Sequence, residues 1–226
     1  MNPQFRNREE AGRLLGQRLA AYNGRPDVIV LGLPRGGVVV AHEIAEALDV
    51  PLDVFIVRKL GVPGFEELAM GAIAMGGTEI VDPDVVEEFD LSGSVIRRVA
   101  AAEWRELERR EHVYRGARPP LDVHNKTVIL VDDGIATGST IRVAIEALRK
   151  LYPARIIVAA VVAPLSTYLM LGSEADEVLC LLTPREFRSV GEFYADFPQL
   201  ADEEVCRLLN DKREESALAH RSGPER

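Results

Sequence analysis

Two adjacent carboxylates, Asp132 and Asp133, directly follow an apolar run at residues 128–131. Such a run is typical of a buried strand in a parallel sheet, and open α/β sheets bind their ligands at the carboxyl ends of these strands. A small turn rich in hydroxyls comes next, and an amphipathic helix follows it at residues 141–151. The turn consists of Ala136, Thr137, Gly138, Ser139 and Thr140. Because carboxylates accept hydrogen bonds from vicinal hydroxyls and helix N-termini bind phosphate, the stretch predicts a cradle for a sugar phosphate.

Two other interpretations compete with this one. An ordinary strand, turn and helix, with the two acids capping the helix, is common in α/β proteins. A nucleotide-binding P-loop has lysine directly after its second glycine, whereas Ser139 follows Gly138 here. The ordered succession of apolar run, acid pair and hydroxyl turn favours the sugar-phosphate interpretation.

A second turn, at residues 34–37, could bind an anion. Arg35, Gly36 and Gly37 follow a predicted strand at residues 28–31. The exposed N–H groups of a glycine turn, together with a guanidinium, form a nest suited to pyrophosphate. Glycine-rich turns between a strand and a helix are frequent, so a merely solvated Arg35 is the alternative.

A basic pair, Arg58 and Lys59, ends the next predicted strand, at residues 52–57. Cations at that end of a sheet would extend the anion site. The alternative is a solvated rim, which is the usual place of lysine and arginine.

In these motifs the chain resembles the type I phosphoribosyltransferases, whose signature is a hydrophobic strand, an acidic pair, two variable residues and a small Thr-Gly-hydroxyl turn. The resemblance implies that Asp132 and Asp133 hold the ribose hydroxyls of phosphoribosyl pyrophosphate (PRPP), and that residues 136–140 bind its 5-phosphate. It also implies that the turn at residues 34–37 binds the pyrophosphate. The basic pair matches one that some members, notably adenine phosphoribosyltransferases, place beside that pyrophosphate.

The resemblance further implies a reaction: magnesium-dependent transfer of the phosphoribosyl group from PRPP to a nitrogen acceptor, a nucleobase or a small amine, with release of pyrophosphate. Mg²⁺ is expected to be held mainly by PRPP, with Asp132 and Asp133 as further candidate ligands. Two rival functions are a regulator that senses PRPP without turnover and a metal-dependent phosphohydrolase that uses the two acids as metal ligands. Release of pyrophosphate separates the transferase from the sensor, whereas the hydrolase would release inorganic phosphate.

The elements that must position these residues follow from the periodicity of apolar residues. A strand, a glycine-rich turn, a helix and a second strand succeed one another after residue 27, which predicts a βαβ unit of a parallel sheet. The predicted strands are residues 28–31, 52–57, 70–75, 128–131, 155–162 and 177–182, and the predicted helices are residues 8–22, 38–48, 95–115 and 141–151. The fold class is therefore α/β. The resemblance specifies it as a type I phosphoribosyltransferase-like, open, mainly parallel twisted sheet with helices on both faces.

One domain is expected over residues 1–210, and the polar residues 211–226 are expected to form a disordered tail. Residues 60–126 are too long for a simple crossover, so they should form an insertion with its own structure. The long helix in this insertion is heavily charged, which is usual for a solvated face. Family members carry a mobile hood in this interval that closes over the pyrophosphate, and the resemblance makes four residues candidates for it. They are Arg109, Arg110, His112 and Tyr114.

The acceptor is open. Where Ala136 stands, 6-oxopurine phosphoribosyltransferases carry an aspartate, and adenine and uracil enzymes commonly carry alanine, so hypoxanthine and guanine are disfavoured. Type I members usually build the acceptor hood after the last core strand, which corresponds here to residues 183–210. The candidate pocket residues are Arg185, Phe187, Phe193 and Tyr194. The aromatic ones could stack a base or close the core against the N-terminal helix. From Phe5 to Leu209 the chain also resembles predicted phosphoribosyltransferases without an assigned acceptor.

Composition narrows the class of protein. With 226 residues, of which 47% are hydrophobic, the chain can bury one sizeable core. A net charge of −9 gives no global footprint for nucleic acid, so no nucleic-acid partner is expected. Cys180 and Cys206 lack neighbouring metal ligands, which fits a reducing compartment rather than a structural zinc site. Because neither a signal peptide nor a membrane-spanning run is recognisable, a soluble cytoplasmic protein is expected. A homodimer is an open alternative to a monomer.

Overall fold

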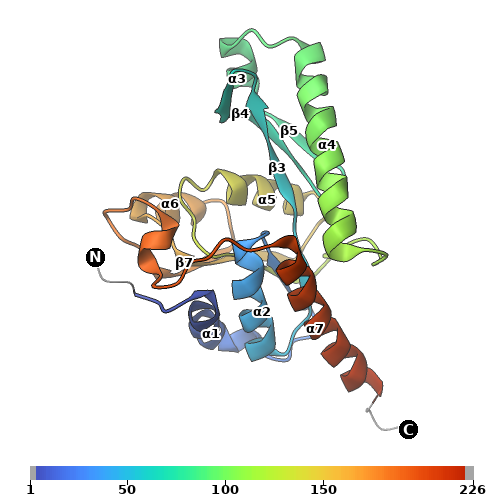
Figure 1. The fold of residues 1–226 in the computed structure, drawn as a ribbon, viewed down its shortest axis with the longest axis vertical. Coiled ribbons are helices and arrows are strands. Elements are labelled where there is room, and N and C mark those ends of the chain that lie inside the picture. The colour runs from blue at the N-terminus through green and yellow to red at the C-terminus, as the bar shows by residue number, and fades with distance from the viewer. Residues whose placement is uncertain (1–3, 222–226) are drawn as a thin grey trace.

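A five-stranded parallel sheet with the strand order β2-β1-β6-β7-β8 forms the centre of the protein (Figure 1). The computed structural model describes the backbone of residues 4–221 and the side chains of residues 4–66 and 68–211. The strands of this sheet are β1 (Val28–Gly32), β2 (Leu52–Val54), β6 (Thr127–Asp132), β7 (Arg155–Val162) and β8 (Glu177–Leu182). Its three inner strands are almost wholly apolar and buried, as strands covered on both faces must be. The predicted open, parallel α/β fold is confirmed.

Helices cover both faces of this sheet (Figure 1). On one face lie α1 (Arg8–Arg18), which continues as η1 (Ala20–Tyr22), and α2 (Gly36–Leu48); on the other lie α5 (Ser139–Arg149) and α6 (Leu165–Leu171). Two glycines of α1 let it approach α2 closely. A Cβ atom on Gly12 would lie 2.7 Å from the Cβ of Glu43, and one on Gly16 would lie 2.7 Å from the Cβ of Ala47. Any larger side chain would push α1 away from α2.

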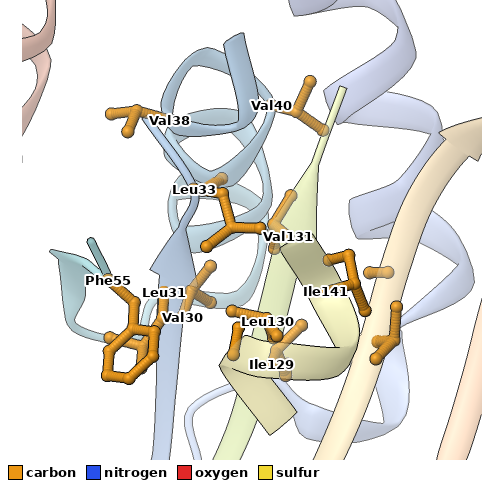
Figure 2. Close-up of a cluster of buried hydrophobic side chains, with 14 of the residues drawn as sticks. Val30, Leu31, Leu33, Val38, Val40, Phe55, Ile129, Leu130, Val131 and Ile141 are labelled. Atoms are coloured by element: carbon orange, nitrogen blue, oxygen red, sulfur yellow. The ribbon is translucent and has the colours of Figure 1, made fainter. Parts of the chain in front are cut away.

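The core lies directly beneath the carboxyl ends of β1 and β6 (Figure 2). Leu31 and Val131 are fully buried there, and Val38 and Ile141, from the first turns of α2 and α5, belong to the same buried cluster. The two helices that start at the carboxyl edge of the sheet thus bury their first apolar residues in the core. Of the helices in the described part of the chain, none is both long enough and apolar enough to span a bilayer.

Residues 57–115, most of which lie in the interval expected to be an insertion, form a small separate unit that we call the hood. An antiparallel sheet in the order β3-β4-β5 packs with one long helix and projects away from the central sheet (Figure 1). These elements are β3 (Val57–Val62), β4 (Phe65–Ala74), β5 (Thr78–Val81), α3 (Pro83–Glu88) and α4 (Gly93–Arg115). The expected strand at residues 70–75 is the second half of β4, and the expected helix at residues 95–115 is α4.

One strand boundary was predicted wrongly. The second core strand, β2, ends at Val54 rather than at residue 57. Phe55 and Ile56 continue the apolar run and are buried, but the backbone leaves the central sheet after the Phe55 N–H donates to the Gly32 carbonyl. Arg58 and Lys59 therefore belong to β3 of the hood and do not end a core strand.

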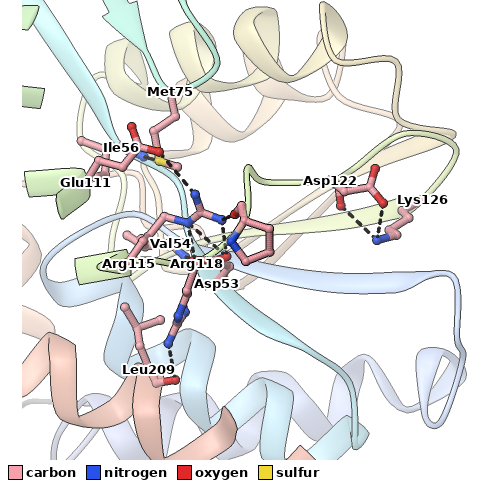
Figure 3. A network of polar contacts seen from close by, with 11 residues as sticks. Asp53, Val54, Ile56, Met75, Glu111, Arg115, Arg118, Asp122, Lys126 and Leu209 are labelled. Atoms are coloured by element: carbon pink, nitrogen blue, oxygen red, sulfur yellow. Dashed lines mark hydrogen bonds and ion pairs between the residues drawn. The ribbon is translucent and has the colours of Figure 1, made fainter. Parts of the chain in front are cut away.

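A buried ion-pair network anchors the hood helix to the edge of the central sheet (Figure 3). Arg115, the last residue of α4, lies 3.1 Å from the Asp53 carboxylate of β2, and the two side chains are only 5% and 12% exposed. The Arg115 guanidinium also donates to the Pro119 carbonyl oxygen at 2.7 Å. Arg118 adds a contact to Asp53 and donates to the Leu209 carbonyl oxygen at 2.8 Å. The network joins the hood, the sheet and the C-terminal helix.

The C-terminal segment consists of η2 (Val190–Phe193) and α7 (Asp202–Arg221). Helix α7 packs against α2, α4 and β2. Its extent differs from the disorder expected for residues 211–226, because the helix continues to Arg221 and residues 222–226 lie outside the described part. This stretch is rich in Glu, Lys, Arg and Ala, which have high helix propensity even without apolar periodicity.

Candidate active site

The glycine turn after β1 is in direct contact with the acid pair after β6. The two strands are parallel neighbours, with Gly32 paired to Val131, so their carboxyl ends lie together. A Cβ atom on Gly36 would lie 1.8 Å from the Oδ2 of Asp133. A Cβ atom on Gly37 would lie 2.6 Å from the Val131 carbonyl oxygen and 3.0 Å from the Cα of Asp132. Only glycine fits at either position, and two motifs far apart in the chain become one site.

Both acids are partly buried, and ionisation is unfavourable for each of them. Burial raises the pKa of Asp132 well above its ordinary value, and the neighbouring charge of Asp133 raises it further. Burial also raises the pKa of Asp133, although a hydrogen bond from Arg8 opposes that shift. Asp132 accepts the backbone N–H of Asp133 at 2.9 Å. A ligand that brings hydroxyl donors or a cation to these carboxylates would offset the cost of their charge.

The predicted phosphate turn forms the N-terminus of α5. Gly138 is its N-cap at φ 82°, and a Cβ atom there would lie 2.8 Å from the Cε of Met170. The hydroxyls of Thr137 and Ser139 lie 3.0 Å apart on the surface, and Thr140 is also exposed. The Ala136 carbonyl accepts a hydrogen bond from the Thr167 hydroxyl at 2.8 Å, which fixes the turn from behind. Exposed hydroxyls at a helix N-terminus are well suited to phosphate.

The two residues of the basic pair have different partners in the hood. Lys59 lines a groove of about 940 Å³ between the hood sheet and α5, together with Thr137, Ser139 and Thr140 of the phosphate turn. Arg58 instead forms an ion pair with Glu103 of α4 at 2.6 Å. The structure therefore brings Lys59 to the predicted phosphate turn and engages Arg58 in holding α4 on β3.

Three of the predicted anion-binding residues meet at a carboxylate that the sequence did not suggest. Tyr114 donates to the Oδ1 of Asp202, the first residue of α7, at 2.6 Å. Arg35 and Arg109 each lie 3.8 Å from the same carboxylate. Burial, and then the bond to Asp202, raise the pKa of Tyr114. The turn after β1 and the hood helix are thus already linked through α7.

The remaining hood candidates have different surroundings. Arg109 and Arg110 both bind Glu106 at 2.8 Å, and these hydrogen bonds lower the pKa of Glu106 to about 2. The His112 side chain is exposed. Neither Arg110 nor His112 takes part in the cluster at Asp202.

Two of the four predicted acceptor residues lie in the core. Phe193 and Tyr194 are 3% and 4% exposed. The Tyr194 hydroxyl donates to the Asp133 carbonyl oxygen at 2.5 Å, and Phe187 stacks on Phe193 with ring centroids 5.8 Å apart. The Arg185 side chain is exposed. Phe193 and Tyr194 therefore fit the interpretation in which the aromatic residues close the core. For Phe187, stacking on a base stays a prediction.

Arg8 is the residue of the site that sequence reasoning missed most completely. It is the first residue of α1, and its Nε lies 2.7 Å from the Oδ2 of Asp133. Its partner is 125 positions away in the chain, so no local spacing could indicate the pair.

The acid pair is the candidate metal-binding group of the site. Within the described residues, no group of three or more histidine, cysteine, aspartate or glutamate side chains could hold a metal ion. Two carboxylates offer hard oxygen ligands of the kind that Mg²⁺ prefers, with further oxygens to come from a bound phosphate ester.

Comparisons with known proteins agree with one another. The sequence model of the phosphoribosyl transferase domain matches residues 6–197. A Mycobacterium tuberculosis protein that is provisionally named a phosphoribosyl transferase is 41% identical over 215 residues, which are 95% of this chain and 48% of that protein. The chain thus spans about half the length of this relative.

Two further comparisons cover other lengths of the chain. A Chloroflexus aurantiacus protein named bifunctional protein PyrR is 34% identical over 133 residues, which are 54% of this chain and 63% of that protein. A crystal structure of a Thermus thermophilus protein superposes with a TM-score of 0.81 at 40% identity, and the match covers 93% of this chain and 99% of the other.

Proposed function

The chain belongs to the phosphoribosyl transferase family, and on that premise we propose that it transfers the phosphoribosyl group of PRPP to a nitrogen acceptor and releases pyrophosphate. The observation that carries the proposal is the contact between the glycine turn and the acid pair. Gly36 lies against Asp133, so the turn proposed to bind pyrophosphate and the carboxylates proposed to bind ribose adjoin each other, as binding of one PRPP molecule by both would require.

Each motif then has one role toward PRPP. Asp132 and Asp133 accept hydrogen bonds from the ribose hydroxyls, and the turn at residues 136–140 binds the 5-phosphate at the N-terminus of α5. Arg35 and the N–H groups of the glycine turn bind the pyrophosphate. Lys59, which shares a groove with the phosphate turn, adds positive charge on the hood side.

In the reaction, the bond from C1 of the ribose to the pyrophosphate oxygen breaks, and a bond from C1 to the acceptor nitrogen forms. C1 becomes oxocarbenium-like in the transition state, so the protein acts mainly by orienting both partners and by stabilising the leaving charge. Bound Mg²⁺ would supply further neutralisation of the pyrophosphate. Asp132 and Asp133 are its candidate protein ligands, and PRPP oxygens would complete the coordination.

The acceptor is proposed to be a nucleobase or a small amine other than hypoxanthine and guanine. Ala136 offers no carboxylate to move a proton on the base, and general acid–base catalysis typically contributes about 10²–10⁴-fold. The exposed position of Ala136, beside the phosphate turn, is compatible with that reasoning. Turnover of hypoxanthine at ordinary enzymatic rates would contradict it.

The test has two stages. Calorimetry with PRPP and Mg²⁺ should give saturable binding, and Asp132→Asn or Asp133→Asn should weaken it, since charge-assisted hydrogen bonds contribute about 1.5–3 kcal/mol each. A screen of bases and amines should then give acceptor-dependent pyrophosphate release. Binding without release for any acceptor would favour the PRPP sensor, and release of inorganic phosphate would favour the phosphohydrolase. Unchanged dissociation constants in both variants would remove the ribose assignment.

A further inference from the structure

Arg8 is held in one position by three different groups. Its Nε donates to the Asp133 carboxylate at 2.7 Å, and its Nη1 donates to the Pro198 carbonyl oxygen at 2.9 Å. Its guanidinium lies over the Phe197 ring, 3.7 Å from the ring centroid, in cation–π geometry. The Arg8 side chain is only 8% exposed. An arginine fixed on three sides carries little residual freedom, so it can fix the carboxylate that it binds.

The backbone that presents Arg8 is also rigid. Asn7 caps α1 by accepting the N–H of Glu10 at 3.0 Å, and the close approach of α1 to α2 determines the height of the helix above the sheet. A Cβ atom on Gly36 would come within 3.1 Å of the Nε of Arg8 as well as clashing with Asp133. Arg8 thus reaches the acid pair past the glycine turn, at the meeting point of both motifs.

The segment after η2 completes the enclosure of Asp133. Phe5 pairs with Tyr194 in a short parallel bridge, and the N–H groups of Ala195 and Asp196 donate to the carbonyl oxygens of Phe5 and Arg6 at 2.8 Å. The Tyr194 hydroxyl binds the carbonyl oxygen of Asp133, while Arg8 binds its carboxylate. Residues from both ends of the domain therefore hold one aspartate by its backbone and by its side chain.

We infer that Arg8 is a positioning residue for ribose recognition: it occupies the Oδ2 of Asp133 and directs Oδ1 toward the sugar hydroxyl. This rests on the proposed binding of PRPP. A carboxylate held on one oxygen presents its second oxygen in one direction, and hydrogen bonds lose strength steeply as their angle departs from linear. Arg8 would also link the ribose site to residues 194–198, the predicted acceptor side.

An ion pair of purely structural value would have different consequences. Removing it would lower stability and would affect every ligand of the site to the same extent. A positioning role instead predicts a selective loss for ligands that contain ribose. Magnesium pyrophosphate provides the contrast, because it has no ribose hydroxyls for the Oδ1 of Asp133 to bind.

The experiment compares Arg8→Met and Arg8→Lys with the unsubstituted chain by calorimetry, using Mg-PRPP and Mg-pyrophosphate as the two ligands. Arg13→Met is the matched control, since Arg13 lies on the same helix and makes only an exposed pair with Glu43. Arg8→Met should weaken PRPP binding by about tenfold or more and leave pyrophosphate binding within about twofold. Arg8→Lys, which keeps the charge but not the planar fork, should lie between, and Arg13→Met should change neither affinity.

A double-mutant cycle supplies a second criterion. If Arg8 acts through Asp133, Arg8→Met should cost little further PRPP affinity in an Asp133→Asn background. Equal losses for PRPP and pyrophosphate, an additive cycle, or unchanged PRPP binding in Arg8→Met would each overturn the inference. If circular dichroism shows that Arg8→Met does not fold, the affinities of Arg8→Lys for PRPP and pyrophosphate are compared instead. A loss of affinity for PRPP alone then supports the inference, and equal losses or no loss overturn it. Absence of PRPP binding by the unsubstituted chain would instead refute the proposed function.

Discussion

Gly36 sets the distance between the two loops that meet at the candidate site. It is not in the left-handed region, so its requirement is one of space: a methyl group would overlap the Asp133 carboxylate, 1.8 Å from Oδ2 and 2.5 Å from Cγ. These atoms are held by Arg8 and cannot move aside without breaking that ion pair.

Gly36→Ala should therefore lower PRPP affinity strongly, by about tenfold or more, because either the turn or Asp133 must move. Gly93→Ala is a suitable control, since a Cβ atom at that position would meet only the end of the Arg97 side chain, at 3.3 Å. Calorimetry with Mg-PRPP measures both variants. Equal affinities of Gly36→Ala and the unsubstituted chain would show that the contact between the two motifs is not needed for binding.

Burial of the two charged acids lowers the stability of the folded chain. This cost should depend on pH, because it is present only when the acids are ionised. Asp132 has a raised pKa in the folded state, so the folded chain holds a proton that the unfolded chain, with a pKa of about 3.9, has already released. The contribution of Asp132 to stability is thus lost as the pH rises from about 4 through the folded pKa.

Asp132→Asn should be more stable than the unsubstituted chain at neutral and alkaline pH, because asparagine keeps the bond from the Asp133 N–H without the buried charge. The difference should shrink as the pH falls toward 4, where Asp132 is protonated in both states. Urea unfolding of both proteins in magnesium-free buffers from pH 5 to pH 9 measures it. A difference that does not vary with pH would mean that Asp132 is not the group that titrates.

At the scale of elements, Arg115 determines how α4 sits on the central sheet. Arg115→Met would leave the Asp53 carboxylate buried with Arg118 as its weaker partner, at 3.5 Å. Breaking a buried pair in this way typically costs about 3–5 kcal/mol, and the remaining contact to Arg118 places the expected loss near the lower end of this range. Lys126→Met, which removes an exposed pair with Asp122, should cost less than about 1 kcal/mol.

Denaturant unfolding at neutral pH gives both values. The loss of Arg115 should also increase hydrogen exchange in α4 and in the N-terminal half of α7, since both are joined by this network (Figure 3). Equal stabilities of the two variants would mean that the hood is held by apolar packing alone.

The elements of the central sheet could be predicted because each carries its own local pattern. The expected strands at residues 155–162 and 177–182 coincide with β7 and β8, and the turn chemistry after β1 and β6 marks the helices that follow. The end of β2 could not be predicted. Phe55 and Ile56 are as apolar as a strand should be, yet they are buried between two sheets, and only the tertiary structure distinguishes the two cases.

At the scale of the whole molecule, the motifs of the site were predictable and their supports were not. Residues within a motif are neighbours in sequence, so their spacing is informative. Arg8 and Asp202, by contrast, come from α1 and α7 and reach Asp133 and Arg35 only through the packing of these helices on α2. An arginine or an aspartate at the start of a helix is common for many reasons. Nothing in the local sequence distinguishes Arg8 and Asp202 from other such residues.

The long helix of the hood is fixed to the central sheet at one end. Arg115 anchors the C-terminal end of α4 to Asp53 of β2, whereas the Glu103–Arg58 pair at the middle of α4 ties it to β3 within the hood. Trp104, which follows Glu103, is partly buried against the core. This single tryptophan is therefore a suitable reporter of changes in how α4 packs.

If the hood closes over bound PRPP and excludes water, as enzyme lids commonly do, Trp104 fluorescence should shift when Mg²⁺ and PRPP are added together and not when either is added alone. The shift should saturate with PRPP, and it should require a higher PRPP concentration in Asp133→Asn, which weakens ligand binding at a residue outside the hood. Emission spectra, with hydrogen exchange across residues 60–115 as a second observable, provide the measurement. If PRPP binds but neither the fluorescence nor the hydrogen exchange changes, Trp104 is a static anchor of α4. The cluster of Arg35, Arg109 and Tyr114 at Asp202 is then the arrangement in the ligand-bound protein as well as in the free one.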